Sequence, residues 1–116
     1  YWVRKVQEAL NDDAKALRGS RVLVLGVAYK KNVSDVRESP AIDIISLLAE
    51  GGADVRYHDP YVEHLEEDGV DLHGVSDLDS EVRAADCIVI VTDHSAYEWD
   101  SIAPMAKKVV DTRGVA

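Results

Sequence analysis

Cysteine is nearly absent from this sequence, and long apolar runs are missing. The one cysteine, Cys87, excludes an intrachain disulfide and agrees with a reducing cytoplasm. Because Cys87 stands in the apolar run 87–91, we expect it to be a small buried hydrophobe. No run approaches the roughly 20 apolar residues that cross a bilayer, and no signal-peptide pattern is present. We therefore expect a cytoplasmic protein without a membrane partner.

Basic residues are also scarce. Thirteen Lys and Arg residues stand against 22 acidic ones, which gives a net charge of −9. This balance excludes nucleic acid as a partner, because phosphates require a basic surface. A carboxylate-rich surface poor in lysine also suits a salt-adapted protein, with an ordinary acidic domain as the alternative. An anionic ligand would need the few cations to cluster at one place.

The glycine-rich fingerprint of dinucleotide-binding turns is missing as well. After the apolar run 21–25 there is one glycine, Gly26, and then Val-Ala-Tyr-Lys, so the pattern G-x-G-x-x-G does not occur. At 116 residues the chain has the size of one domain. Since it opens at Tyr1 without a methionine, we interpret it as a fragment of a longer protein.

The apolar runs that are present predict a parallel sheet. Residues 21–25 show no polar alternation, which suits a strand buried on both faces. A helix at about 39–49 and a shorter strand at 54–58 complete a βαβ unit with a right-handed crossover. With strands at 87–91 and 108–111, we predict a three-layer, Rossmann-like α/β domain. Its mainly parallel sheet has about four to six strands, with strand 21–25 central and strand 54–58 near an edge.

A helix is predicted over residues 1–17. Its apolar residues recur at near-helical spacing, and Arg18-Gly19 supplies a cation and a stop signal. Trp2, Val3, Val6 and Leu10 fall on roughly one face. We expect this apolar stripe to be exposed and to favour self-association.

Other segments are predicted from weaker signals. A helix capped by Ser76 or Asp77 should run to about residue 85, and a short helix should cover 96–103. Residues 70–73 could form a small strand. The remaining candidates are the histidines. His58, His73 and His94 do not have metal-site spacing, so we expect structural roles for them, a solvated helix position for His64, and no metal site.

The loop that follows the first strand is the candidate functional site. In open α/β sheets, ligands bind beyond the carboxyl ends of strands, where loops and helix N-termini converge. This loop carries Lys30, Lys31, Asp35, Arg37 and Glu38. From spacing alone, the lysines could be merely solvated, and Asp35 and Arg37 could form a loop ion pair that adds little to stability. Glu38 precedes the helix cap, where its charge could simply complement the helix dipole.

Several ordered motifs resemble one known family. They are GVAYKK at 26–31, DVRESP at 35–40, YHDPY at 57–61, TDH at 92–94 and VDTR at 110–113. Together they are similar to the nucleotide-sugar 6-dehydrogenases, which include the UDP-glucose, UDP-N-acetylhexosamine and GDP-mannose dehydrogenases. The resemblance extends over nearly the whole chain and points to the C-terminal nucleotide-sugar-binding domain.

The resemblance implies a division of the chain and a parent activity. Residues 1–19 would be the end of an interdomain linker helix, and residues 20–116 the nucleotide-sugar-binding domain. The parent enzyme, a homodimer, would oxidise the C6 alcohol of a UDP-sugar to the uronate for polysaccharide biosynthesis, with NAD as cofactor. NAD would be bound mainly by a domain absent from this chain, which also lacks the catalytic cysteine. The fragment would bind without catalysing, and a UDP-sugar is favoured over GDP-mannose.

The resemblance also assigns site residues. Tyr29 and Lys30 would contact the nucleotide sugar, as would Arg113, while Arg37 would reach NAD across an interdomain cleft. Whether Lys31 and Glu38 take part stays open. No catalytic residue is expected within the chain.

Two other classes of protein remain as alternatives. One is a stand-alone nucleotide-binding module on a Rossmann-like frame. The other is a receiver-like regulatory domain, since Asp59 and Asp93 end strands as a phosphate-accepting acid does. Against a receiver, the first strand ends in Gly26 and Val27 rather than in an acidic pair that could hold magnesium.

Overall fold

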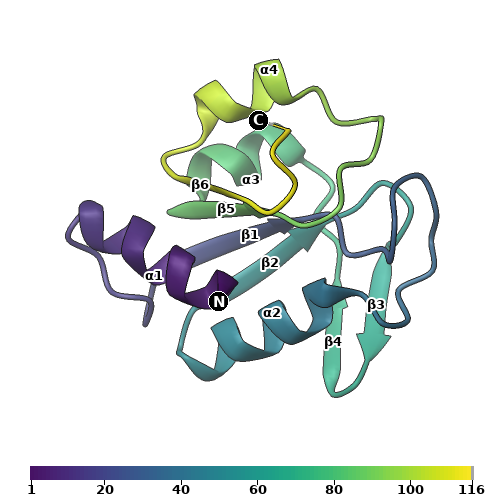
Figure 1. Cartoon of the computed structure of the whole chain (residues 1–116), viewed down its shortest axis with the longest axis horizontal. Coiled ribbons are helices and arrows are strands. Elements are labelled where there is room, and N and C mark those ends of the chain that lie inside the picture. Colours follow the sequence, from purple (N-terminus) through teal and green to yellow (C-terminus); the bar gives the residue numbers. More distant parts are fainter. Residues whose placement is uncertain (116) are drawn as a thin grey trace.

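A four-stranded parallel sheet forms the centre of the molecule. In a computed structural model that describes residues 1–115, its strands follow the order β2-β1-β5-β6 (Figure 1). Strand β1 pairs in parallel with β2 on one side and with β5 on the other. The bounds are β1 (Arg21–Leu25), β2 (Asp54–His58), β5 (Cys87–Ile90) and β6 (Val109–Asp111).

The burial of β1 follows from its sequence. Val22 through Leu25 are all 0% exposed, as an apolar run without polar alternation requires at the centre of a sheet. The edge strand β2 is only partly buried. Both positions, central for β1 and at an edge for β2, confirm the prediction.

Helices cover both faces of the sheet and make the three layers (Figure 1). Helices α1 (Trp2–Asp12) and α2 (Pro40–Glu50) pack on the face that presents Val22 and Val24. The other face, with Leu23 and Leu25, is covered by α3 (Leu78–Ala84), α4 (Trp99–Ile102) and a 3₁₀ turn, Ala103–Met105. Among residues 1–115, no helix has the length and apolarity that crossing a bilayer requires.

Two helix starts have the capping residues that the sequence predicts. The Ser39 hydroxyl accepts a hydrogen bond from the N–H of Ala41 at 3.2 Å, and Pro40 occupies the first helical position. Asp77 caps α3 by accepting from the N–H of Ser80 at 3.2 Å.

Helix α1 differs from the prediction in length and in packing. It ends at Asp12 rather than near Leu17, and Ala14 adopts a positive φ of 57° just beyond it. Val6 and Leu10 are 0% exposed within the core, and Trp2 is partly buried against it. The expectation of an exposed apolar stripe is therefore wrong, because α2 and the sheet already cover that stripe.

An antiparallel hairpin lies between β2 and α3 along the chain. It consists of β3 (His64–Glu67) and β4 (Val70–His73), and it stands beside α2 (Figure 1). The small strand expected at 70–73 is confirmed, whereas the helical position expected for His64 is wrong. Residues 64–67 alternate between exposed and buried side chains, which is the pattern of a strand. The helix expected at 96–103 is reduced to α4 and the 3₁₀ turn.

Candidate functional site

The loop of residues 26–39 lies at the point where the sheet order reverses. From β1 the chain passes through α2 to β2 on one side, while β5 and β6 lie on the other side of β1. Loops that leave the carboxyl ends of β1 and β5 therefore lie next to each other and flank this point, which is where open α/β sheets bind ligands. The segment 91–98 after β5 forms the second flank.

Gly26 lets the two flanks approach each other. Its φ is +84°, and an added Cβ would lie 2.3 Å from the carbonyl oxygen of Thr92. A side chain at this position would thus meet backbone that cannot move aside, in a conformation that non-glycine residues avoid. The hydroxyl of Thr92 donates a hydrogen bond of 2.7 Å to the carbonyl of Ala28, which joins the flanks a second time.

A buried carboxylate holds the first residues of the loop. Oδ2 of Asp59 accepts hydrogen bonds from the N–H groups of Val27 at 2.8 Å and Ala28 at 3.2 Å. Oδ1 of Asp59 accepts from the N–H of Tyr61 at 2.8 Å. The Asp59 side chain is 0% exposed. Asp59 therefore cannot be the residue that a phosphate donor reaches in a receiver domain.

His94 extends this network to the far part of the loop. Nε2 of His94 lies 2.8 Å from Oδ2 of Asp59, and Nδ1 accepts a 2.8 Å hydrogen bond from the N–H of Asn32. Since Nδ1 accepts, the proton of the neutral ring is on Nε2 and is donated to Asp59. Asn32 has a positive φ of 63°, and its amide pairs with Ser95 at 2.8 and 2.9 Å. The loop is thus tied to the segment after β5.

Tyr29 and Lys30 extend from this fixed backbone into solvent. Tyr29 is 49% exposed, although its N–H donates to the carbonyl of Asp35 at 2.6 Å and so closes the loop. Lys30 and Lys31 are both exposed. Tyr29, Asp35, Arg37 and Glu38 line a shallow hollow of about 340 Å³.

Arg37 forms an ion pair with Asp35, which was one of the alternatives that the sequence offered for these two residues. Nε and Nη2 of Arg37 donate to the two carboxylate oxygens of Asp35 at 3.1 and 3.0 Å. The hydrogen bonds from Arg37 hold the pKa of the Asp35 carboxyl below its ordinary value. Because the Arg37 side chain is 79% exposed, the pair orients a guanidinium that solvent still reaches.

Arg113 lies beyond β6, at the same edge of the sheet as the loop. Its Nε donates a 2.8 Å hydrogen bond to the carbonyl of Val91, directly after β5. Its N–H donates to Oδ1 of Asp111 at 2.9 Å. This anchoring holds a second cation beside the carboxyl end of β5.

His58 and Tyr97 form a separate polar contact near the end of β2. The Tyr97 hydroxyl donates to the His58 carbonyl at 2.8 Å and lies 2.9 Å from Nδ1 of His58. Burial lowers the pKa of His58. The structural roles expected for His58 and His94 are therefore confirmed, whereas His73 is exposed. The hydrogen bond between Asp59 and His94 and its support of the loop were not predicted, although the motifs at 57–61 and 92–94 contain both residues.

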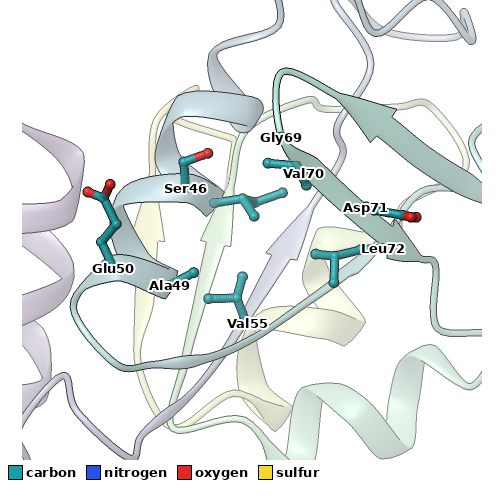
Figure 2. Close-up of a pocket in the computed structure, with 9 residues that line it drawn as sticks. Ser46, Ala49, Glu50, Val55, Gly69, Val70, Asp71 and Leu72 are labelled. Carbon is teal, nitrogen blue, oxygen red and sulfur yellow. The ribbon is translucent and has the colours of Figure 1, made fainter.

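A groove larger than the shallow hollow lies elsewhere. It has about 560 Å³ and runs between α2 and β4, where Ser46, Ala49, Val55 and Leu72 line it (Figure 2). No lysine or arginine is among its lining residues, so it offers no cation to a phosphate. The shallow hollow at the switch point remains the better candidate for an anionic ligand.

Fold and loop together define a three-layer α/β domain with a tethered, solvent-facing loop after the first strand. Residues 23–116 match the UDP binding domain of the UDP-glucose/GDP-mannose dehydrogenase family. The chain belongs to this family and corresponds to its C-terminal UDP-binding domain.

Individual relatives agree with this assignment. The chain is 35% identical over 103 residues to a UDP-N-acetyl-D-mannosamine dehydrogenase of Methanococcus maripaludis, covering 82% of the chain and 23% of the relative. It is 32% identical over 121 residues to a UDP-glucose 6-dehydrogenase of Rickettsia bellii, covering 97% and 27%. A solved UDP-D-ManNAc dehydrogenase from Pyrococcus horikoshii superposes with a TM-score of 0.80 at 29% identity, covering 99% of the chain and 27% of that structure. The chain thus spans about a quarter of the length of these proteins.

Proposed function

We propose that this chain binds the UDP-sugar substrate of an NAD-dependent nucleotide-sugar 6-dehydrogenase. Tyr29 and Lys30 contact the nucleotide sugar from the loop after β1, and Arg113 contacts it from the end of β6. Arg37 reaches NAD, which is held mainly by another domain of the parent protein.

The observation that carries the proposal is the contrast between a fixed loop backbone and exposed functional side chains. Asp59 and His94 hold residues 27–32 from the buried side, while Tyr29 and Lys30 face solvent at the switch point. A preorganised loop binds more tightly because less conformational entropy is lost on binding. The tyrosine offers a ring and a hydroxyl, and the lysine offers a compact charge suited to phosphate oxygens.

Local charge supports an anionic ligand in an acidic chain. Between Tyr29 and Glu38 three cations stand against two carboxylates, although the whole chain carries −9. One of these carboxylates, Asp35, is paired with Arg37. The loop thus carries a small local excess of positive charge, which lowers the repulsion that a nucleoside diphosphate meets there.

In the parent protein, the proposed reaction oxidises the C6 alcohol of UDP-glucose or a UDP-N-acetylhexosamine to the carboxylate. It consumes two molecules of NAD⁺, which take one hydride each, and one water, which supplies the second carboxylate oxygen when it releases the cysteine-bound intermediate. Neither the cysteine nor the main NAD site lies in this chain. We further propose that the parent is a cytoplasmic homodimer. Burial raises the pKa of Cys87 to about 12, so this thiol is no candidate for the nucleophile.

Calorimetry on the purified chain tests the binding function. We expect UDP and UDP-sugars to bind with one-to-one stoichiometry and GDP-mannose to bind more weakly. The same preparation should form no NADH from NAD and a UDP-sugar. Equal affinity for UDP and GDP would contradict the UDP preference. NADH production would contradict the proposal that catalysis requires domains other than this one.

A further inference from the structure

The β3–β4 hairpin carries two imidazoles and two carboxylates on one face. Its cross-strand pairs are His64 with His73 and Glu66 with Asp71. Because side chains alternate along a strand, these four residues share a face, and Leu65 lies on the other. Leu65 is 0% exposed, whereas all four are exposed, so this His–carboxylate face is turned to solvent.

The division of β4 into two faces is visible in Figure 2. Val70 and Leu72 lie toward α2 and the groove between α2 and β4, while the carboxylate of Asp71 points away from them. Val70 and Leu72 thus attach the hairpin to the rest of the domain. Substitutions on the His–carboxylate face leave that attachment intact.

Possible ligand atoms on this face already lie close together. One nitrogen each of His64 and His73 and one oxygen of Asp71 lie within 4.8 Å of one another. His64 Nε2 is 2.5 Å from Asp71 Oδ1 and 3.8 Å from an oxygen of Glu66. The two imidazole rings stack with centroids 4.2 Å apart and planes inclined by 10°.

The surroundings favour a cation. No lysine or arginine occurs between Arg56 and Arg83, and nine acidic residues lie in that stretch. Five of these acids lie on the hairpin or directly before it: Glu63, Glu66, Glu67, Asp68 and Asp71. A divalent ion would reduce the repulsion among these carboxylates.

We propose that His64, Asp71 and His73 bind a divalent transition-metal ion, for which Zn²⁺ is the best fit, with Glu66 as a fourth ligand. Two imidazoles with carboxylates suit Zn²⁺, Ni²⁺ or Cu²⁺, whereas Mg²⁺ and Ca²⁺ prefer oxygen ligands alone. The ion takes the place of the proton between His64 and Asp71. It also connects β3 to β4 through side chains.

The required rearrangement is confined to exposed side chains. Because the two imidazole rings are stacked with planes inclined by only 10°, they must turn before both in-plane lone pairs point at one ion. With metal–ligand bonds of about 2.0–2.2 Å, ligand atoms of a tetrahedral zinc site lie about 3.4 Å apart. His64 Nε2 and Asp71 Oδ1 must therefore separate by about 1 Å from their present 2.5 Å, while the His73 nitrogen lies within 4.8 Å of both atoms. All four side chains are exposed and can rotate without disturbing the core.

Calorimetric titration of the untagged chain with Zn²⁺, Ni²⁺ and Mg²⁺ tests the proposal. We expect one equivalent of Zn²⁺ or Ni²⁺ to bind at micromolar metal, and Mg²⁺ to bind far more weakly. Loss of an outer hydrogen-bond partner already costs about 10–100-fold in metal affinity, so His64→Gln and His73→Gln should each cost at least that much. Saturating Zn²⁺ should also raise the melting temperature of the unsubstituted chain, and it should not raise that of either variant.

The matched control is Asp71→Asn against Asp68→Asn. Both substitutions remove one negative charge from the hairpin, but Asp68 lies in the turn at a φ of 48°, which asparagine tolerates. Asp71→Asn should weaken Zn²⁺ binding and Asp68→Asn should not. The proposal is overturned if the chain binds no Zn²⁺, or if the double variant His64→Gln/His73→Gln, with an unchanged circular dichroism spectrum, binds it as tightly as the original.

Discussion

Replacement of Asp59 by asparagine should loosen the binding loop and destabilise the domain. The carboxylate accepts hydrogen bonds from Val27, Ala28 and His94 on one oxygen and from Tyr61 on the other. A hydrogen bond to a charged group contributes about 1.5–3 kcal/mol, and a neutral one about 0.5–1.5 kcal/mol. If the amide oxygen of the substituted side chain still accepts from the three groups that donate to Oδ2, each of those hydrogen bonds is weaker by about 1 kcal/mol. The amide NH₂ then faces the N–H of Tyr61, so that fourth hydrogen bond is lost.

We therefore expect Asp59→Asn to lower the free energy of unfolding by about 3–4 kcal/mol, which is on the order of 10 °C in melting temperature. Urea denaturation followed by circular dichroism measures it. Asp93→Asn is the control, because it removes the same charge from a carboxylate for which residues 1–115 provide no hydrogen bond or ion pair. Equal, small losses in both variants would refute the idea that Asp59 supports the loop.

Three further predictions concern the core, the glycine turn and acid stability. Leu10→Ala should cost about 2–5 kcal/mol in urea denaturation, because Leu10 is 0% exposed, and a surface-like loss would contradict the packing of α1. Gly26→Ala should reduce UDP affinity and stability together, since its Cβ would collide with Thr92; normal values for both would exclude that close approach. The hydrogen bond from Lys15 holds the pKa of Asp86 below 3.8, so its stabilisation is present above pH 3.8 and is lost as the pH falls through the lowered pKa. Stability measured from pH 6 to pH 2 should therefore fall less steeply for Asp86→Asn than for the original chain, and parallel curves would contradict this.

The sheet was predictable because burial follows from local sequence. Apolar runs without alternation identify β1 and β5, and capping residues identify the starts of α2 and α3. The packing of α1 was not predictable in this way. An apolar helix face looks the same in sequence whether it is covered by the chain's own sheet or by another domain.

The candidate site also has a part that local sequence predicts and a part that depends on contacts between distant residues. The loop that carries Tyr29 and Lys30 could be placed because it follows a recognisable strand, whereas the roles proposed for the two residues come from the family resemblance. The network of Asp59, His94 and Asn32 could not, because its hydrogen bonds join residues 35 and 62 positions apart in the sequence. The position of His64 was also mispredicted, since the acidic segment around it has no clear periodicity until β4 pairs with it.

The central claim is that the loop after β1 binds a UDP-sugar through Lys30. The most direct test compares Lys30→Ala with Lys31→Ala by calorimetric titration with a UDP-sugar, in this chain and in the parent protein. Both lysines are exposed and adjacent, so the two variants have equal net charge and no core contact is lost. Lys30→Ala should weaken binding by about 10–100-fold, the equivalent of about 1.5–3 kcal/mol, with little change in melting temperature. Lys31→Ala should weaken binding clearly less, and equal affinities for both variants and the original chain would contradict the claim.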